Sequence, residues 1–539
     1  MNLNLLWAGA ILDELRRAGV REAVICPGSR SAPLAIAAAQ SFRSCVVLDE
    51  RSAAFFALGA AKVSQRPVIV LCTSGSAGAH FLPAILEAEA GAIPLIAITA
   101  DRPPELHGFG APQTFDQQRL FGNHARFLEL GAPDPALVPH LRATIAQAAR
   151  ASGPLHLNAP FREPLAPIDQ PMPCVRNEPA AQHFSARGLP KLTAIAAELS
   201  KRPRGVVVCG PRDANDDLNA AARELSRSLG YALIADAASQ LRGDDAVSHA
   251  DLILRSAPWA KALKPEAVVR LGGGGSSKVV QAWLEEVPYQ VVVRERGEAI
   301  DPMHEAAAII DADGPAACRA LAGHAQGPLQ ALFAEAERRA RAGLEMAMCW
   351  SEPLIAREAT RASELLYASS SMPVRDLDAF GGAPRGRVLA NRGLNGIDGI
   401  VSSAAGAAWA SGQATTVLLG DLALLHDLSG LVAAARLHIS LRVLCVNNDG
   451  GGIFHFLPIA EHEQVFEPLF ATPHGMNLPG AALLTGAAFT QVSDVKALRA
   501  ALAAEQKFEL IEARTDRTSN VEQHRALRTA VLTALGDPP

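Results

Sequence analysis

Short apolar runs alternate with helical patterns through the first hundred residues of the chain. Continuous runs rich in Val and Ile predict strands at 22–28, 45–50, 67–75 and 94–101. Segments with apolar residues at helical spacing predict helices at 5–18, 31–40, 52–63 and 81–90. Apolar strands that alternate with helices are typical of a parallel sheet covered on both faces.

The same alternation returns twice further along the chain. A second block begins at RGVVVCGPRD (204–213), and a third contains VLANRG, TTVLLGD, LRVLCVNND and FELIEAR. A charged segment from about 331 to 368 predicts a helical bridge between these blocks, and a Pro-rich stretch from 160 to about 190 indicates a linker. The simplest interpretation is an α/β fold of three doubly wound parallel-sheet domains.

Composition narrows the class of protein. The 539 residues exceed what one hydrophobic core accommodates, and the content of 49% apolar and 5% aromatic residues suits closely packed helices and sheets. A formal charge of only −5, without a Lys/Arg block, does not predict the basic surface that binds nucleic acid or a membrane. No apolar run is long enough for membrane insertion, and the start of the chain lacks the layout of a signal peptide.

The cysteines indicate the redox environment. None of the eight forms a CxxC pair, and several lie in apolar strand-like runs. We therefore predict buried free thiols and a cytoplasmic protein. The eight positions are Cys26, Cys45, Cys72, Cys174, Cys209, Cys318, Cys349 and Cys445.

Two acids stand where the strand at 45–50 gives way to a helix. From the residues alone, the preferred interpretation is that Asp49 or Glu50 caps that helix and interacts with its positive N-terminal end. A functional carboxylate at this position is the alternative.

The segment 418–454 carries the strongest chemical signal. A strand ends in Gly420-Asp421, a helix follows, and a second strand ends in Asn447-Asn448-Asp449 before three glycines. Asp421 and Asn448 should emerge together at the carboxyl edge of a parallel sheet, where open α/β sheets bind ligands. Carboxylate and amide oxygens suit Mg²⁺ that also holds a diphosphate, and glycines let the backbone approach phosphates. The alternative is a helix cap plus an Asn-rich turn.

This spacing, GD followed after about 25 to 30 residues by NN, resembles the signature of thiamine diphosphate enzymes. Further stretches resemble segments of one family, the 2-succinyl-5-enolpyruvyl-6-hydroxy-3-cyclohexene-1-carboxylate synthases of menaquinone biosynthesis, in order from residue 20 to 460. In that family GDL commonly replaces GDG, as Leu422 does here. The stretches are CPGSRSAPL, LDERSAAFFALGAAK, TSGSAGAHFLPA, TADRPPEL, SSMPVRDLD, NRGLNGIDGIVSSAAG and VNNDGGGIFHFLP.

The resemblance implies a domain organisation and a subunit arrangement. Residues 1–185 would form a pyrimidine-binding domain, 186–350 a middle domain and 351–539 a diphosphate-binding domain. The cofactor would lie between the first domain of one subunit and the third of another. A homodimer or a dimer of dimers with active sites at the subunit interface is therefore expected.

The resemblance also assigns roles at the cofactor. Glu50 would be the catalytic residue that contacts the aminopyrimidine ring, since an apolar pocket raises the pKa of a carboxyl group until it shares a proton near neutral pH. Asp49 would point elsewhere and serve as a cap or a structural acceptor. Ile397 would support the bent cofactor, with Ile453 and Phe454 lining the same pocket, although core packing is the alternative for these three. The other cofactor-binding residues would be Gly420, Asp421, Leu422, Asn448 and Gly450, with Asp421, Asn448 and Gly450 also holding Mg²⁺ or Mn²⁺.

The implied reaction is the decarboxylation of 2-oxoglutarate followed by a Stetter-type 1,4-addition of the succinyl carbanion equivalent to isochorismate. Both substrates are dicarboxylates, which the planar fork of arginine binds well. For each cation alone, an exposed surface charge is the alternative explanation. The implied substrate-binding residues are Ser29, Arg30, Arg102, Gln113, Lys278, Ser371, Arg375 and Arg392.

Two departures and two competing hypotheses remain open at this point. Pro112 replaces an Asn of some members beside Gln113, and Asp449 adds a negative charge that should turn away from the phosphates. GGGGSSK (272–278) lacks the order of a phosphate loop, so a dinucleotide is not expected there.

Two competing hypotheses concern the function. In the first, the protein is a 2-oxoacid decarboxylase or acetolactate-type carboligase, which uses the same cofactor with other substrates. In the second, it is a non-catalytic binding protein that keeps only the fold.

Overall fold

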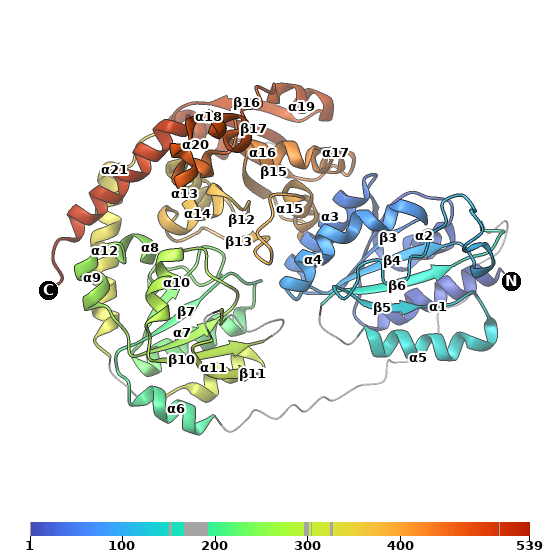
Figure 1. The fold of residues 1–539 in the computed structure, drawn as a ribbon, viewed down its shortest axis with the longest axis horizontal. Coiled ribbons are helices and arrows are strands. Elements are labelled where there is room, and N and C mark those ends of the chain that lie inside the picture. The colour runs from blue at the N-terminus through green and yellow to red at the C-terminus, as the bar shows by residue number, and fades with distance from the viewer. Residues whose placement is uncertain are drawn as a thin grey trace. The chain divides into compact units, whose positions relative to one another are not determined.

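The computed structural model describes residues 2–149, 153–165, 192–295, 301–302, 304–323, 327–505 and 507–539. Three separate sheets follow one another along the chain, and every strand pairing within them is parallel. Figure 1 draws the strands as arrows and labels many of them and of the helices that cover them. The expected fold class, three parallel-sheet α/β domains, is confirmed.

The chain forms two compact units by its internal contacts. The first unit comprises residues 1–185, 399–412 and 427–439, and the second comprises 186–398, 413–426 and 440–539. The predicted contiguous boundaries at 185 and 350 remain a prediction.

The first unit contains the first sheet, in the order β2-β1-β3-β4-β6-β5. Its central strands are buried and continuous in apolar residues, which is why they lie inside the sheet. The strands are β1 (Glu22–Ile25), β2 (Arg43–Val46), β3 (Val68–Cys72), β4 (Leu95–Asp101), β5 (Arg126–Glu129) and β6 (Leu155–Pro160). The helices are α1 (Leu3–Arg17), α2 (Ala32–Ser41), α3 (Glu50–Ser64), α4 (Leu82–Ala90), α5 (Val138–Ala148), α15 (Ile400–Ser411) and α17 (Leu428–Arg436).

Helices α3 and α15 of the first unit approach each other at two glycines. A Cβ on Gly59 would lie 1.9 Å from the carbonyl oxygen of Ser403, and one on Gly406 would lie 1.9 Å from that of Phe56. No side chain fits at either position, so glycine permits the backbones to pack together. This contact fixes the helix that begins with Glu50.

Gly59→Ala is therefore expected to destabilise the protein by about 3 kcal/mol, since the new methyl group meets backbone that has no room to yield. The midpoint of urea unfolding, followed by circular dichroism, measures the loss. Gly480→Ala is the matched control, because Gly480 lies in α19 (Leu478–Thr485) with no atom within 4 Å of a new Cβ. It should be neutral or stabilise by up to about 1 kcal/mol. Equal midpoints for the two variants would contradict this packing.

The second unit contains the other two sheets, in the orders β11-β10-β9-β7-β8 and β13-β12-β14-β15-β17-β16. The strands of the second sheet are β7 (Gly205–Cys209), β8 (Ala232–Ala235), β9 (Ala267–Leu271), β10 (Tyr289–Arg294) and β11 (Ala306–Asp311). Those of the third are β12 (Leu365–Ala368), β13 (Arg387–Ala390), β14 (Thr415–Gly420), β15 (Leu441–Asn447), β16 (Ala488–Val492) and β17 (Phe508–Arg514).

Helices of the second unit cover these sheets, and a buried apolar cluster joins the second sheet to α12 and α21. They are α6 (Thr193–Ser200), α7 (Asp216–Leu229), α8 (Ala250–Ile253), α9 (Ala257–Ala262), α10 (Lys278–Glu285), α11 (Gly314–Leu321), α12 (Leu329–Ala347), α13 (Glu352–Ala362), α14 (Met372–Phe380), α16 (Asp421–His426), α18 (Glu463–Phe466), α19, α20 (Val495–Ala503) and α21 (Arg517–Leu535).

The predicted helical bridge at 331–368 is wrong at its end. Helices α12 and α13 occupy most of it, but residues 365–368 form strand β12. Those four residues are buried between β13 and β14, and this tertiary environment favours a strand. Most of the predicted linker at 160–190 lies outside the described residues, whereas Pro160 ends β6.

The cysteine prediction holds with one exception. The described cysteines are free, and all but Cys349 are buried. Cys349 is exposed because it lies in the short segment between α12 and α13, and Cys174 lies outside the described residues. Among the helices described here, none combines the length and apolar character needed to cross a membrane.

Candidate active site

A cavity lies at the carboxyl edge of the third sheet, inside the second unit. The chain leaves β12 toward β13 on one side and leaves β14 toward β15 on the other, which makes this edge a topological switch point where α/β sheets bind ligands. The cavity measures about 160 Å³. Every predicted cofactor or metal residue except Glu50 lines it: Ile397, Gly420, Asp421, Leu422, Asn448, Gly450, Ile453 and Phe454.

Pairing of two strands brings Asp421 and Asn448 together. The parallel register of β14 and β15 aligns Gly420 with Val446, so both side chains follow at the same edge. Asp421 is 2% exposed, and its carboxylate accepts hydrogen bonds from the backbone N–H of Leu422 (2.6 Å) and of Gly450 (3.0 Å). Burial raises the pKa of Asp421, because its charged form loses hydration.

The amide of Asn448 has its two ends in different environments. Its nitrogen donates to Oε1 of Glu352 at 2.8 Å. Its oxygen is buried and has no hydrogen-bond partner among the described residues. Buried polar atoms are rarely left without a partner. An unpartnered amide oxygen beside the carboxylate of Asp421 matches the donor set that a divalent cation prefers.

The glycines after Asn448 are required by a neighbouring loop. Gly450 has a φ of 136°, and a Cβ there would lie 2.1 Å from the carbonyl oxygen of Ala471. A Cβ on Gly451 would lie 2.5 Å from the carbonyl oxygen of Phe470. The expected space for phosphates is therefore on the cavity side of these residues, because the loop at 470–471 fills the other side.

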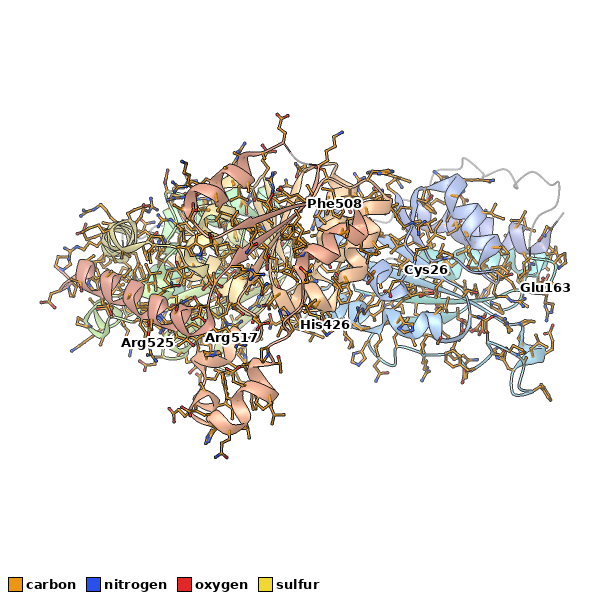
Figure 2. The ribbon with its side chains drawn as sticks, turned by 90° about the horizontal axis from the view of Figure 1, so that it is seen from above. Cys26, Glu163, His426, Phe508, Arg517 and Arg525 are labelled. Carbon is orange, nitrogen blue, oxygen red and sulfur yellow. The ribbon has the colours of Figure 1, made fainter. Side chains whose placement is uncertain are left out.

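Asp449 is held by backbone outside the cavity lining. Its carboxylate accepts from the N–H groups of Gly475 (2.8 Å) and His474 (3.0 Å), and these hydrogen bonds lower its pKa. Arg517, labelled in Figure 2, donates to the carbonyl oxygen of Asp449 at 2.7 Å. The charge of Asp449 is thus directed to the loop at 474–475.

His474 is a site residue that the sequence did not reveal. Its Nδ1 accepts from the N–H of Met476 at 2.9 Å, so the ring proton of the neutral form is on Nε2. That Nε2 lies 3.3 Å from Oδ2 of Asp421. His474 thus lies next to the carboxylate of Asp421 from outside the cavity lining.

A pair of acidic residues also lines this cavity and was not predicted from the sequence. Glu352 and Asp376 both line the cavity. Nε2 of His524 lies 2.7 Å from Oδ1 of Asp376. Burial, followed by the charge of Asp376, raises the pKa of Glu352.

Two predicted substrate-binding arginines of the second unit lie near one another. Arg375 donates to the carbonyl oxygen of Ser371 at 2.6 Å, and burial together with the charge of Arg392 lowers its pKa. Ser371 lines the cavity and has a φ of 72°, a strained conformation that is common at functional sites. Lys278 is exposed at the start of α10, and no contact joins it to these residues in the described part of the chain.

The first unit gathers the other predicted substrate-binding residues at the carboxyl edge of the first sheet. Arg102 donates to the hydroxyl of Ser74 and to Oε1 of Gln113 (3.1 Å). Arg30 donates to the carbonyl oxygen of Phe161, and burial together with the charge of Arg30 lowers the pKa of Arg102. Ser29 is exposed beside Arg30.

Two further observations concern Arg30 and Gln113 in this group of residues. Arg30 also pairs with Glu163, labelled in Figure 2, at 3.2 Å, so an incoming carboxylate would compete with that acid. Gln113 is exposed with a φ of 54°, and Pro112 precedes it.

The two acids at the start of α3 have different structural positions. Asp49 caps the helix, since its Oδ1 accepts from the N–H of Ser52 at 2.8 Å, which confirms the capping prediction for this residue. Glu50 is the first helical residue and is half-buried. Within the described residues, no hydrogen bond or ion pair occupies its carboxylate. It is therefore available to a ligand.

A buried network supports the start of α3 within the first unit. Asp427 is fully buried and accepts from the N–H (2.7 Å) and hydroxyl (2.8 Å) of Ser402 at the start of α15. The hydroxyls of Ser52 and Ser429 are 2.6 Å apart, which links α3 to α17. Burial raises the pKa of Asp427 to about 6. Asp427 could not be predicted as a network residue from its local sequence.

Comparison with known proteins agrees with this geometry. The model described as "Thiamine pyrophosphate enzyme, N-terminal TPP binding domain" matches residues 7–120, and "Middle domain of thiamine pyrophosphate" matches 186–361. These two matches, together with the three parallel sheets and the cavity lined by Asp421 and Asn448, place the chain in the class of thiamine diphosphate-dependent enzymes.

Curated relatives narrow the class. Proteins named 2-succinyl-5-enolpyruvyl-6-hydroxy-3-cyclohexene-1-carboxylate synthase are similar over nearly the whole chain. The protein of Myxococcus xanthus is 47% identical (100% of this chain, 99% of the relative), and that of Chloroflexus aurantiacus is 41% identical (98% and 96%). That of Geobacillus kaustophilus is 40% identical (97% of each). The chain belongs to the 2-succinyl-5-enolpyruvyl-6-hydroxy-3-cyclohexene-1-carboxylate synthase family.

Proposed function

We propose that this protein decarboxylates 2-oxoglutarate and adds the resulting succinyl unit to isochorismate, giving 2-succinyl-5-enolpyruvyl-6-hydroxy-3-cyclohexene-1-carboxylate and CO2 in menaquinone biosynthesis. Full-length similarity to synthases of this name supports it. The observation that carries the proposal is that one cavity gathers the predicted cofactor residues of the second unit together with Ser371, whose carbonyl oxygen accepts a hydrogen bond from Arg375. The free cysteines are compatible with a cytoplasmic location, which is part of the proposal.

Three groups would hold the diphosphate end of the cofactor. Asp421, the Asn448 amide oxygen and the main chain of Gly450 would bind Mg²⁺ or Mn²⁺, and the unpartnered Asn448 oxygen supports this fit. Ile397, Ile453 and Phe454 would contact the apolar part of the cofactor and exclude water. When bound, thiamine diphosphate supplies the carbon nucleophile that the side chains of this protein lack.

Glu50 would act at the other end of the cofactor. Its carboxylate would share a proton with the aminopyrimidine ring and so activate the cofactor. We propose that this carboxylate comes from a second subunit, so that a homodimer, or a dimer of dimers, is the smallest active form.

The arginines would bind the substrate carboxylates in two groups. Arg375, Arg392 and Ser371 would act from the second unit, and Arg30, Arg102 and Gln113 from the first. Ser29 and Lys278, which are exposed, would reach substrate only in the assembled site.

Arg375→Ala is expected to lower kcat/KM by about 10²-fold, because a partly buried charge-assisted contact to a carboxylate is worth roughly 2–3 kcal/mol. Steady-state kinetics with both substrates varied in turn measures the loss and assigns it to one of them. Arg385→Ala is the control, since Arg385 is exposed and pairs with Glu364 on the surface. Equal kinetics for Arg375→Ala and wild type would remove Arg375 from the site.

Release of CO2 from carboxyl-labelled 2-oxoglutarate tests the proposed function directly. Release should require thiamine diphosphate and Mg²⁺, and adding isochorismate should convert the succinyl unit into the six-membered-ring product, identified by mass spectrometry. Pyruvate as sole substrate should release little CO2. Preference for pyruvate would favour an acetolactate-type carboligase, and absence of release from either acid would favour a non-catalytic protein.

A further inference from the structure

We propose that Glu352 is a positioning residue that fixes the Asn448 amide so that its oxygen, and not its nitrogen, faces the cation. This inference rests on the proposed metal-binding role of Asn448. An asparagine amide presents an acceptor at one end and two donors at the other. A donor end turned toward a divalent cation would repel it. Something in the protein must therefore select the orientation.

The contact between the two side chains selects it. Nδ2 of Asn448 donates to Oε1 of Glu352 at 2.8 Å, and the same oxygen accepts from the hydroxyl of Thr515, so this oxygen is the acceptor in both contacts. The amide nitrogen is therefore held at Glu352, and the oxygen is left buried without a partner among the described residues. A Cβ on Gly452 would lie 2.6 Å from that nitrogen, so the glycine leaves room for this orientation.

Glu352 is itself held rigidly. It begins α13 directly after Ser351, whose hydroxyl caps the helix by accepting from the N–H of Leu354. The hydroxyl of Thr515, in the segment after β17, donates to the same Oε1 at 3.0 Å. The N–H of Thr515 donates to the carbonyl oxygen of Asn447, the last residue of β15. These contacts join α13 and the end of β15 around one carboxylate.

A buried acid at this place costs stability, which indicates a function. Glu352 is 3% exposed, and the nearby charge of Asp376 adds to the cost of burial. Glu352 faces Asn448, Thr515, Asp376 and, at longer range, His524. An apolar side chain would avoid that cost but would leave the Asn448 amide nitrogen and the Thr515 hydroxyl without this acceptor. Groups that orient metal ligands typically change metal affinity by about 10- to 100-fold when they are removed.

The affinity for Mn²⁺, measured by electron paramagnetic resonance of the full-length protein with saturating thiamine diphosphate, tests the inference without relying on activity. Glu352→Ala should weaken Mn²⁺ binding by about 10- to 100-fold. Glu352→Gln should stay within about threefold of wild type, because its carbonyl oxygen still accepts from Asn448. Glu358→Ala is the matched control on the same helix. It removes a buried carboxylate that pairs with Arg499 and should leave the affinity unchanged.

A paired exchange distinguishes positioning from general damage. Asn448→Asp alone places two carboxylates against each other and should weaken Mn²⁺ binding. Adding Glu352→Gln should recover at least about tenfold, because the new amide donates to the new carboxylate and leaves its second oxygen for the cation. If Glu352→Ala does not fold, the paired exchange still tests whether Glu352 positions Asn448.

The outcomes separate this inference from the proposed function. Wild-type affinity in Glu352→Ala, or no recovery in the paired exchange, would overturn the role of Glu352. Wild-type affinity in Asn448→Ala, or no Mn²⁺ binding by the wild type, would instead overturn the proposed metal site.

Discussion

Glu50→Gln is expected to lower kcat for CO2 release from 2-oxoglutarate by about 10²- to 10⁴-fold, the range typical of a lost proton-transfer group. Glutamine keeps the size of the side chain but cannot exchange a proton with the aminopyrimidine ring. The helix that carries it should be unaffected, because Asp49 provides the cap and Gly59 and Gly406 the packing. Thiamine diphosphate should still bind, since its diphosphate end is held elsewhere.

Asp49→Asn is the matched control for Glu50→Gln. The two acids are adjacent, but asparagine is as good a helix cap as aspartate, so this variant should retain activity and stability. Single-turnover measurement of CO2 release compares the two variants with wild type. Unchanged decarboxylation in Glu50→Gln would be incompatible with the role given to this residue.

Asp421→Ala is expected to weaken thiamine diphosphate binding in the presence of Mg²⁺ by at least about 10²-fold. The buried carboxylate is the only formal charge among the three proposed cation ligands, and without it the remaining ligands would hold a divalent cation, and with it the diphosphate, much more weakly. Isothermal titration calorimetry with and without Mg²⁺ measures the change. The dependence of cofactor binding on Mg²⁺ should disappear in the variant.

Asp449→Asn is the control for Asp421→Ala. Asp449 lies close in sequence to Asn448, but its carboxylate bonds to the backbone of His474 and Gly475. Cofactor affinity should therefore remain within about threefold of wild type, since a charge held outside the lining is partly screened. If Asp449→Asn lost the cofactor while Asp421→Ala kept it, the ligand assignment would be reversed.

The sequence was most informative for candidate site residues that directly follow a strand. Asp421 and Asn448 each follow an apolar strand of one parallel sheet, so their meeting at its carboxyl edge could be predicted from spacing alone. Glu352 and His474 could not be found in this way. Glu352 lines the cavity from α13, whereas His474 approaches Asp421 from a loop outside the cavity lining, and both contacts are tertiary.

Around Glu50, too, local sequence predicts the local contact but not the tertiary ones. Local sequence predicts a cap at the start of α3, and Asp49 provides it. The buried carboxylate of Asp427, which joins α15 to the network of Ser52 and Ser429, has no local signal because its partners lie on helices far apart in sequence. β12 was missed because burial between two strands outweighs a helical pattern.

Hybrid dimers test the central claim most directly, namely that Glu50 of one subunit and Asp421 of another act on the same cofactor. Glu50→Gln and Asp421→Ala chains are co-expressed with different tags, and the doubly tagged hybrid is purified. Each parent should be inactive, whereas the hybrid should recover about half of wild-type CO2 release, because one of its two sites combines two intact halves. A hybrid as inactive as its parents would contradict the claim, since it would place both residues of each site in a single chain.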